Sequence, residues 1–458
     1  MTAITVDYLK KSGLKVGVCV SGGLDSKTVS KRLIEAGCTV EAFSADLGQP
    51  DEDDIQNVQR RMATCGVETT IVDLKADMAD GCFDVIQYQA RYDGGYWNTT
   101  GIGRFVTCRG LVEAMQKNGV GVLSHGATGR GNDQMRFERY TNVLAPNMAV
   151  YAPWRDPGLL EEFPGRTEMA AYLNKFGIEA SQLRWKGAAA ATAARVRVPA
   201  CCLRRPKPLE MGSCHFFNRQ AFVGPKKKYS TDANLAGLSH EAEDLESVET
   251  PMLIVDPEMG VWPSKAPDAM EEVTLGFEKG RCVSINGKKV TPLEAMHEAN
   301  AIGGRNGVGI SHALENRIIG TKSRGVYEAP GMELLGSALK FLYQAVLDRR
   351  ATKLFWHLSD LISDQIYDGR YFDPTTTAAR LAVAELTKPA TGTVKVGAYK
   401  GSVFFLSMSG VQKSLYNEAD SSMEASDGLN PVSSQGYAEI QAVEARSLAL
   451  AGQISSRP

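Results

Sequence analysis

A glycine-containing segment near the N-terminus, Ser21 to Lys27, has the residue types of a phosphate-binding loop. Its two adjacent glycines have no Cβ atom, so the backbone N–H groups can turn toward one point. The helix expected directly after the glycines adds the partial positive charge of its N-terminus. The spacing matches neither a Walker A loop nor the dinucleotide-binding fingerprint. We therefore expect an anion site built mainly from backbone amides, with an ordinary strand-to-helix turn as the alternative.

A second polar segment, His125 to Arg136, combines three glycines with hydroxyl, amide, carboxylate and guanidinium groups. Thr128, Asn132 and Asp133, together with backbone amides, can hold both ends of an amino acid. Donors would bind its carboxylate and acceptors would bind its amine. A surface loop with a helix cap at Asn132 or Asp133 is the alternative interpretation.

The elements around these loops predict a doubly wound α/β domain from residue 14 to about residue 180. Short β-branched runs predict strands at 14–20, 39–45, 68–73 and 119–124. Amphipathic stretches predict helices at 26–36, 53–64 and 104–117. Ligands bind such sheets beyond the carboxyl ends of the strands, so we expect the loops at 21–26, 45–49 and 125–133 to converge on one edge.

A second mixed α/β segment is expected from residue 229 to about residue 430. Its predicted helices and strands lie at 331–348, 353–367, 376–387, 394–399 and 402–407. A helix at 437–451 follows, with an apolar stripe formed by Ile440, Val443, Leu448 and Leu450. We expect this terminal helix to dock on another subunit or on its own domain.

The overall composition is that of a soluble globular protein, and its net charge gives no indication of binding to nucleic acid or to an anionic membrane. The 458 residues are 43% hydrophobic and 23% charged, with a net charge of −2. No apolar run approaches the roughly 20 residues that a membrane helix needs, and no secretory signal is visible. The nine cysteines include no C-x-x-C pair. We therefore expect reduced thiols and a cytoplasmic location.

One stretch, residues 184–228, departs from this balance because it contains eleven basic residues and one acidic residue. A nucleic-acid-binding arm is one interpretation, but the stretch has no organised aromatic residues. We expect an insertion or linker, of which residues from about Lys186 to Gly224 can be deleted with little loss of folding. In the alternative, Phe216, Phe217 and Phe222 dock near the site and make the stretch a lid.

Seven motifs in order along the chain closely resemble those of the argininosuccinate synthase family, in particular its longer bacterial-type branch. They are SGGLDS, ADLGQPDED, WNTTGIGR, SHGATGRGNDQMRFE, YAPWRD, YSTDANLAGLSHEAEDLE and ALENRIIGTKSRGVYEAPG. The first motif also resembles the pyrophosphate loop of enzymes that split ATP into AMP and pyrophosphate. The resemblance covers residues 14 to 430 except the basic stretch.

The resemblance implies a ligase of arginine biosynthesis that joins citrulline to aspartate through a citrullyl-adenylate. ATP and Mg²⁺ would be the cofactors, and no side-chain nucleophile would be needed. It further implies a homotetramer. The fold class is then α/β, with a pyrophosphate-loop nucleotide-binding domain, a second synthetase domain and a C-terminal helix. The expected boundaries are 1–183, a basic linker at 184–228, 229–435, and an oligomerisation helix at 436–458.

Matching the motifs position by position implies three sets of binding residues. For ATP they are Cys19, Val20, Ser21, Gly22, Gly23, Leu24, Asp25, Ser26, Lys27, Ala45, Gly126, Thr128, Asp133 and Asp232. For aspartate they are Thr99, Thr128, Asn132 and Asp133. For citrulline they are Tyr96, Thr100, Asn132, Arg136, Ser230, Ser239, Glu241, Glu315 and Tyr327. The metal ligands stay unknown.

Simple structural roles are open for some of these residues. Glu315 with Arg317 can form a surface ion pair, Tyr327 can be a core residue, and Ser230 can cap a helix. Glu315 and Tyr327 are twelve positions apart, which would align poorly on a helix and favours a loop or a pair of strands.

The sequence departs from the family pattern at the pair Ser26-Lys27, at Asp46 and in the basic stretch at 184–228. Ser26 and Lys27 stand where the family usually has Thr-Ser, so the Lys27 ammonium group either binds phosphate or points away. Asp46 stands where an asparagine is usual, which concerns the adenosine side of the site.

Two other functions stay open at this point. A ligase of the same ATP-splitting type could use a different acceptor. Such enzymes would need catalytic cysteines or a glutaminase domain, and this sequence has no C-x-x-C pair. A relative without catalytic activity could bind nucleic acid through the basic stretch, with a strong dependence on salt.

Overall fold

The computed structural model describes residues 4–52, 54–93, 95–129, 131–179, 229–424, 428 and 430–454. The basic stretch at 184–228, including Phe216, Phe217 and Phe222, lies outside the described residues. Within the described residues, no helix is both long and apolar enough to cross a membrane.

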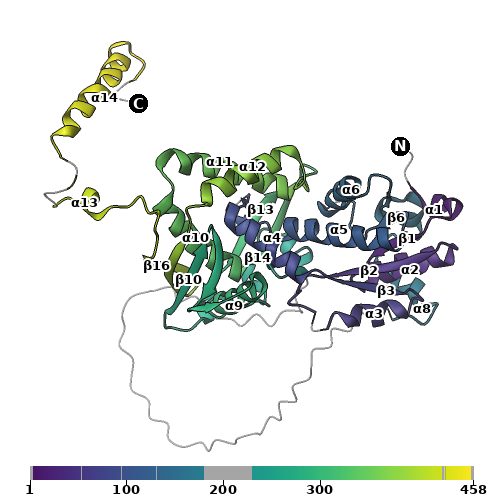
Figure 1. The fold of residues 1–458 in the computed structure, drawn as a ribbon. Coiled ribbons are helices and arrows are strands. Elements are labelled where there is room, and N and C mark those ends of the chain that lie inside the picture. The colour runs from purple at the N-terminus through teal and green to yellow at the C-terminus, as the bar shows by residue number, and fades with distance from the viewer. Residues whose placement is uncertain are drawn as a thin grey trace, which may run out of the picture.

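The N-terminal half is built on a five-stranded parallel sheet with the order β3-β2-β1-β6-β7 (Figure 1). The strands are β1 (Val16–Cys19), β2 (Val40–Asp46), β3 (Thr69–Asp73), β6 (Val122–Ser124) and β7 (Ala149–Tyr151). The chain moves outward from β1 to β2 and β3, then returns to the other side of β1 with β6 and β7. The doubly wound fold is thereby confirmed, and the loops after β1 and β6 flank the point at which the strand order reverses.

Helices surround this sheet and connect its strands. They are α1 (Val6–Ser12), α2 (Leu24–Glu35), α3 (Gln56–Ala63), α4 (Lys75–Tyr88), α5 (Thr99–Lys117), α6 (Asp133–Leu144), α7 (Pro157–Glu162) and α8 (Arg166–Asn174). A 3-10 turn spans Pro153–Arg155. The helices expected at 26–36 and 53–64 are present with shifted ends.

The sequence pattern does not indicate α4, and α5 begins five residues before the helix expected at 104–117. Glycines explain both differences, because glycine weakens a local helix signal but permits close packing. A Cβ atom on Gly81 of α4 would lie 3.0 Å from Ile102, and one on Gly103 of α5 would lie 2.8 Å from the amide nitrogen of Asn234. Tertiary contacts therefore stabilise helices that the local pattern does not indicate.

The C-terminal half contains two larger antiparallel sheets. The first has the order β12-β11-β10-β15-β16 and the second β13-β14-β9-β8. Their strands are β8 (Ser230–Asn234), β9 (Gly237–Glu241), β10 (Glu271–Glu278), β11 (Arg281–Ile285), β12 (Lys288–Lys289), β13 (Ile310–Asn316), β14 (Lys322–Glu328), β15 (Gly392–Tyr399) and β16 (Ser402–Ser409). A short ribbon of β4 (Arg91–Tyr92) and β5 (Tyr96–Trp97) precedes α5.

The helices of this half are α9 (Pro292–Arg305), α10 (Pro330–Val346), α11 (Arg349–Tyr367), α12 (Pro374–Thr387), α13 (Glu418–Ser421) and α14 (Ser433–Leu450). The 3-10 turns are Glu243–Glu246, Met252–Ile254 and Pro263–Lys265. Helix α14 stands away from the rest of the chain (Figure 1), and none of its residues is buried.

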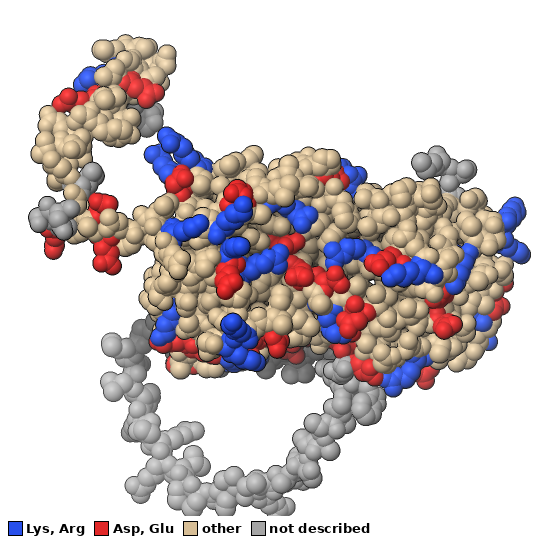
Figure 2. Space-filling view, viewed as in Figure 1, with Lys and Arg blue, Asp and Glu red and all other residues tan. Residues whose placement is uncertain are grey.

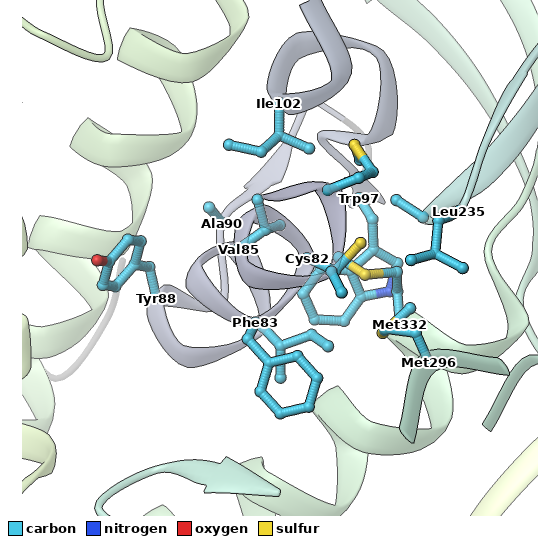
Figure 3. Packing of buried hydrophobic residues seen from close by; sticks show 14 of the residues in the cluster. Cys82, Phe83, Val85, Tyr88, Ala90, Trp97, Ile102, Leu235, Met296 and Met332 are labelled. Carbon is cyan, nitrogen blue, oxygen red and sulfur yellow. The ribbon is translucent and has the colours of Figure 1, made fainter. Parts of the chain in front are cut away.

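The two halves share a hydrophobic core. Helix α4 contributes Cys82 and Phe83, and the second half contributes Leu235, Met296 and Met332 (Figure 3). A separate core on the sheet lies under α2, α3 and α8. Because one core joins both halves, the loops at the edge of the parallel sheet face the second half at a defined distance.

Candidate active site

A cleft of about 1260 Å³ opens at the carboxyl edge of the parallel sheet. The loops after β1, β2 and β6 line it, and β8 from the second half lines it as well. The three loops that the sequence predicts at one edge therefore do converge. The binding residues expected for ATP that line the cleft are Cys19, Val20, Ser21, Asp25, Ser26, Ala45, Gly126, Asp133 and Asp232.

The loop after β1 is held open by its own hydrogen bond and by glycine geometry. The Ser21 backbone N–H donates to Ser26 Oγ at 3.1 Å, and Gly22 adopts a φ of +74°. Gly23 is the N-cap residue of α2 and provides no side-chain cap. The first N–H groups of α2 thus lack a side-chain partner from the cap position, which suits an anion.

Lys27 does not join this loop through its side chain. Its Nζ donates to the backbone carbonyl of Glu179 at 2.8 Å, and the residue is buried. Of the two orientations open from the sequence, the one pointing away is present. The Lys27 ammonium group is therefore turned away from the loop after β1.

Asp46 shapes the turn after β2. Its carboxylate accepts from the Gly48 backbone N–H at 3.1 Å and pairs with Lys75 Nζ at 2.6 Å. Gln49 Nε2 donates to the carbonyl of Ala45 at 2.9 Å. The aspartate at this position therefore has a local structural role in the loop that carries Ala45.

Arg104 links the two halves across the cleft. Its guanidinium pairs with Asp133 on α6 and with Asp232 on β8, each at 2.8 Å. Burial opposes its charge, but the two carboxylates outweigh burial and raise the pKa of Arg104. Arg104 is the last residue of the motif WNTTGIGR and is not among the binding residues expected from the sequence. Its position one turn after Thr100, on a helix that begins at Thr99, is the signal that could have identified it.

Asp133 is a shared acceptor rather than a free carboxylate. Besides Arg104, it pairs with Arg136 Nη1 at 2.9 Å. Burial alone would raise its pKa, yet the two arginines lower the pKa of Asp133. Asp133 is therefore ionised, and any ligand amine that binds there must share it with these arginines.

A second polar cluster lies beside the cleft and contains residues expected to bind citrulline. Tyr327 Oη and Tyr367 Oη donate to the two oxygens of Glu315 at 2.9 and 3.0 Å. Asn132 Nδ2 donates to Tyr367 Oη at 2.7 Å, and Arg136 Nε donates to the Tyr367 carbonyl at 2.8 Å. Tyr367 lies in none of the seven motifs, so the motif pattern does not indicate it as a site residue.

The expected strand pair is confirmed for Glu315 and Tyr327, which lie on the antiparallel strands β13 and β14. The alternative interpretation of Glu315 as half of a surface ion pair with Arg317 is wrong, because Glu315 is buried and accepts hydrogen bonds from two tyrosines. Tyr327 also stacks on Tyr96 with ring centroids 4.1 Å apart. Tyrosine rings thus form a wall next to the Glu315 carboxylate.

The remaining expected residues lie where β8, β9 and α5 meet. Ser230 is on a strand and its Oγ donates to the Glu241 carbonyl at 3.2 Å, so a helix cap at Ser230 is wrong. Ser239 Oγ lies 3.5 Å from the Asp232 carbonyl, and Thr100 Oγ1 lies 3.5 Å from the Asp232 carboxylate.

Burial raises the pKa of Glu241 to about 7, and Asp232 and Asp133 add to this shift. Thr99 begins α5, and its carbonyl accepts from Asn234 Nδ2 at 3.2 Å. Thr128 is exposed, and its carbonyl accepts from the Gly131 backbone N–H at 3.2 Å. Thr128 thus lies on the segment that connects the cleft loop to α6.

Comparison with known proteins matches both halves of the chain to one family. The family model described as "Arginosuccinate synthase N-terminal HUP domain" matches residues 15–179, and that described as "Arginosuccinate synthase C-terminal domain" matches residues 229–448. The chain belongs to the argininosuccinate synthase family. An argininosuccinate synthase from Rhodopirellula baltica is 34% identical over 440 residues, covering 95% of this chain and 98% of the relative. The suspected family is confirmed, and the chain is an enzyme of the ligase class.

In this member of the argininosuccinate synthase family, the expected binding residues form two groups. One surrounds the cleft at the phosphate-loop edge, and the other surrounds Glu315. The Asp133–Arg136 ion pair joins them. A nucleotide and an amino acid bound to the two groups would therefore meet near α6.

Proposed function

We propose that this chain catalyses ATP-dependent ligation of citrulline and aspartate to argininosuccinate in arginine biosynthesis. The observation that carries the proposal is the cleft with its phosphate loop, joined through Asp133 and Arg136 to the Glu315 cluster. In the first step, the ureido oxygen attacks the α-phosphorus and the bond to the β-phosphate breaks, so pyrophosphate leaves. In the second, the aspartate amine attacks the activated carbon, AMP leaves and the amine loses a proton.

For ATP, the loop residues Cys19 to Lys27 would supply backbone N–H groups to the phosphates. Ala45 and Gly126 would lie near the nucleoside, while Thr128, Asp133 and Asp232 would contact the nucleotide from the opposite wall. Burial raises the pKa of the Cys19 thiol to about 12, so this cysteine is protonated near neutral pH. That protonation supports a mechanism without a cysteine nucleophile.

For the amino acids, the charge of each group suits one end of a zwitterion. Thr99, Thr128, Asn132 and Asp133 would hold aspartate, and the Asp133 carboxylate would accept from the aspartate amine while it also pairs with Arg104 and Arg136. Citrulline would contact Arg136 through its carboxylate and the carboxylates of Glu241 and Glu315 through its donors. Its remaining contacts would be Tyr96, Thr100, Asn132, Ser230, Ser239 and Tyr327. Catalysis then consists of positioning and electrostatic stabilisation.

Magnesium is the expected partner of ATP in this reaction. Among the residues that the structure describes, no group of three His, Cys, Asp or Glu side chains is arranged to hold a metal. Mg²⁺ on a nucleotide needs only one or two carboxylates, because phosphates and water supply the other ligands. Asp25 lines the cleft in the loop, and burial raises its pKa. Asp25 would hold the ion, which would offset the phosphate charge.

The test is to incubate the protein with ATP, Mg²⁺, citrulline and aspartate, and to omit each in turn. We expect AMP and pyrophosphate only when ATP and citrulline are both present, and argininosuccinate only when aspartate is added. ADP as the nucleotide product would contradict the proposal. AMP formation without citrulline would favour a ligase with another acceptor.

The nucleic-acid-binding alternative predicts binding without AMP formation, lost as salt rises. On the face shown in Figure 2, basic and acidic residues are intermixed over the described surface. This distribution favours the ligase.

The proposal also includes four further points. The chain belongs to the bacterial-type branch, its domains are bounded at residues 183, 229 and 435, it forms a homotetramer, and it is located in the cytoplasm. Helix α14 exposes Ile440, Val443 and Leu450. Docking of this helix on a second copy of the chain would bury them, which supports an oligomer.

A further inference from the structure

Arg61 on α3 brings a positive charge to the loop after β1. Its Nη2 lies 3.3 Å from the Ser21 carbonyl and 2.6 Å from Glu52 Oε2. A Cβ atom placed on Gly22 would lie only 2.7 Å from Arg61 Nε. The guanidinium therefore packs directly on the glycine whose backbone geometry opens the loop.

The other arginines that line the described part of the cleft, and Lys27 behind the loop, are committed elsewhere. Lys27 donates to the Glu179 carbonyl. Arg104 is held between Asp133 and Asp232. Arg60 pairs with Asp54, and its side chain is 65% exposed. Of the three arginines that line the described part of the cleft, Arg61 is the one in contact with the loop itself.

Arg61 also retains donor capacity toward a ligand. Its side chain is only 21% exposed, and its buried Nε has no hydrogen-bond partner among the described residues. A guanidinium has five N–H donors in a planar fork that matches phosphate geometry. Donors remain for phosphate oxygens even while Arg61 keeps its bond to Glu52.

In the protein without bound nucleotide, Glu52 is the ion-pair partner of Arg61. Its other oxygen accepts from Asn57 Nδ2 at 3.3 Å, so the carboxylate is fixed on its own side. A single carboxylate carries one negative charge, whereas the β- and γ-phosphates of ATP carry more. The phosphates therefore compete well for the guanidinium.

We propose that Arg61 binds the phosphates of ATP and of the leaving pyrophosphate, and that Glu52 holds its guanidinium in place in the ligand-free protein. The inference rests on the proposed function in that the loop after β1 is taken to bind ATP. It adds a side chain that no quoted motif contains. It also explains how the loop obtains a cation although Lys27 points away.

The experiment measures the Kd of ATP, pyrophosphate and adenosine by calorimetry for the full chain, without citrulline. For Arg61→Gln we expect ATP and pyrophosphate to bind about 10- to 100-fold more weakly, as for loss of a charge-assisted contact. Adenosine binding should change less than about twofold. Arg61→Lys keeps the charge but not the fork and should give a smaller loss. Arg305→Gln, which breaks a surface ion pair with Glu271 away from the cleft, is the matched control and should bind ATP nearly as the parent does.

Glu52→Gln decides between phosphate binding and mere support of the loop. If Arg61 binds phosphate, removing its competitor leaves ATP affinity equal or tighter. If the ion pair only supports the loop, Glu52→Gln weakens ATP binding as much as Arg61→Gln does, and the proposal is overturned. Equal loss for adenosine and ATP in Arg61→Gln would overturn it too. These measurements need no turnover, so failure of the ligase reaction would be recognised separately.

Discussion

Tyr367 donates a 3.0 Å hydrogen bond to Glu315, a residue 52 positions earlier in the chain. The bond joins the end of α11 to β13. Since Asn132 and Arg136 from the first half also bond to Tyr367, this residue holds groups from both halves in one arrangement. Its ring is fixed as well, because it stacks on Tyr92 with centroids 3.6 Å apart.

Tyr367→Phe should damage citrulline use more than nucleotide use. The ring and its stacking stay, while the hydrogen bonds to Glu315 and from Asn132 are lost. At about 1 kcal/mol for each bond, we expect KM for citrulline to rise roughly 5- to 30-fold. Initial rates with each substrate varied in turn measure this. Tyr399→Phe, which removes a hydroxyl bonded to Asp268, is the control, and equal changes in KM for ATP and citrulline would contradict the positioning role.

Asp133→Ala should reduce both stability and aspartate use, because it leaves Arg104 and Arg136 without a shared carboxylate. We expect a stability loss on the order of 3 kcal/mol, as for a buried pair broken from one side. Thr128→Ala is the comparison, since Thr128 is exposed and its loss should raise KM for aspartate without lowering stability. Denaturant unfolding and initial rates distinguish the two. An Asp133→Ala protein of parental stability would show that the arginines find other partners.

His125 should make the protein less stable in acid. It is fully buried against Phe137, and neither ring nitrogen has a hydrogen-bond partner within the described residues. Burial, with a smaller effect from Arg155, lowers its pKa from 6.5 to about 4. Between these values the unfolded chain binds a proton that the folded chain does not, so stability is present above pH 6.5 and falls as the pH drops toward 4.

The expected contribution of His125 is on the order of 3 kcal/mol over that range. Urea unfolding at several pH values, compared with His125→Gln, isolates it as a difference in slope. Parallel stability curves for the two proteins would show that His125 is not the responsible group.

Deleting residues 430–458, which include α14, should lower the molecular mass in solution while the rest of the chain stays folded. The helix has no buried residue and exposes Ile440, Val443 and Leu450. Light scattering gives the mass. The single substitution Ile440→Asp, which alters the chain far less than the deletion does, should also weaken the assembly. An unchanged mass for both variants would refute a role of α14 in assembly.

The sequence alone determined features that depend on neighbouring residues. The apolar run into Ser21-Gly22-Gly23 and the helix after it form as expected, because backbone geometry at glycine is a local property. The alternation of short strands and helices along the sequence was enough to predict the doubly wound sheet. The twelve-residue spacing of Glu315 and Tyr327 was enough to favour paired strands.

Only the tertiary structure decided which side chains face each other across the two halves. Arg104 meets Asp232 over 128 positions, and Arg136 meets Tyr367 over 231. The periodicity of hydrophobic residues along the sequence does not predict such contacts, since they depend on how the two halves pack together around their shared core. Lys27 shows the same limit, because a long flexible side chain takes its direction from a distant acceptor, here the Glu179 carbonyl.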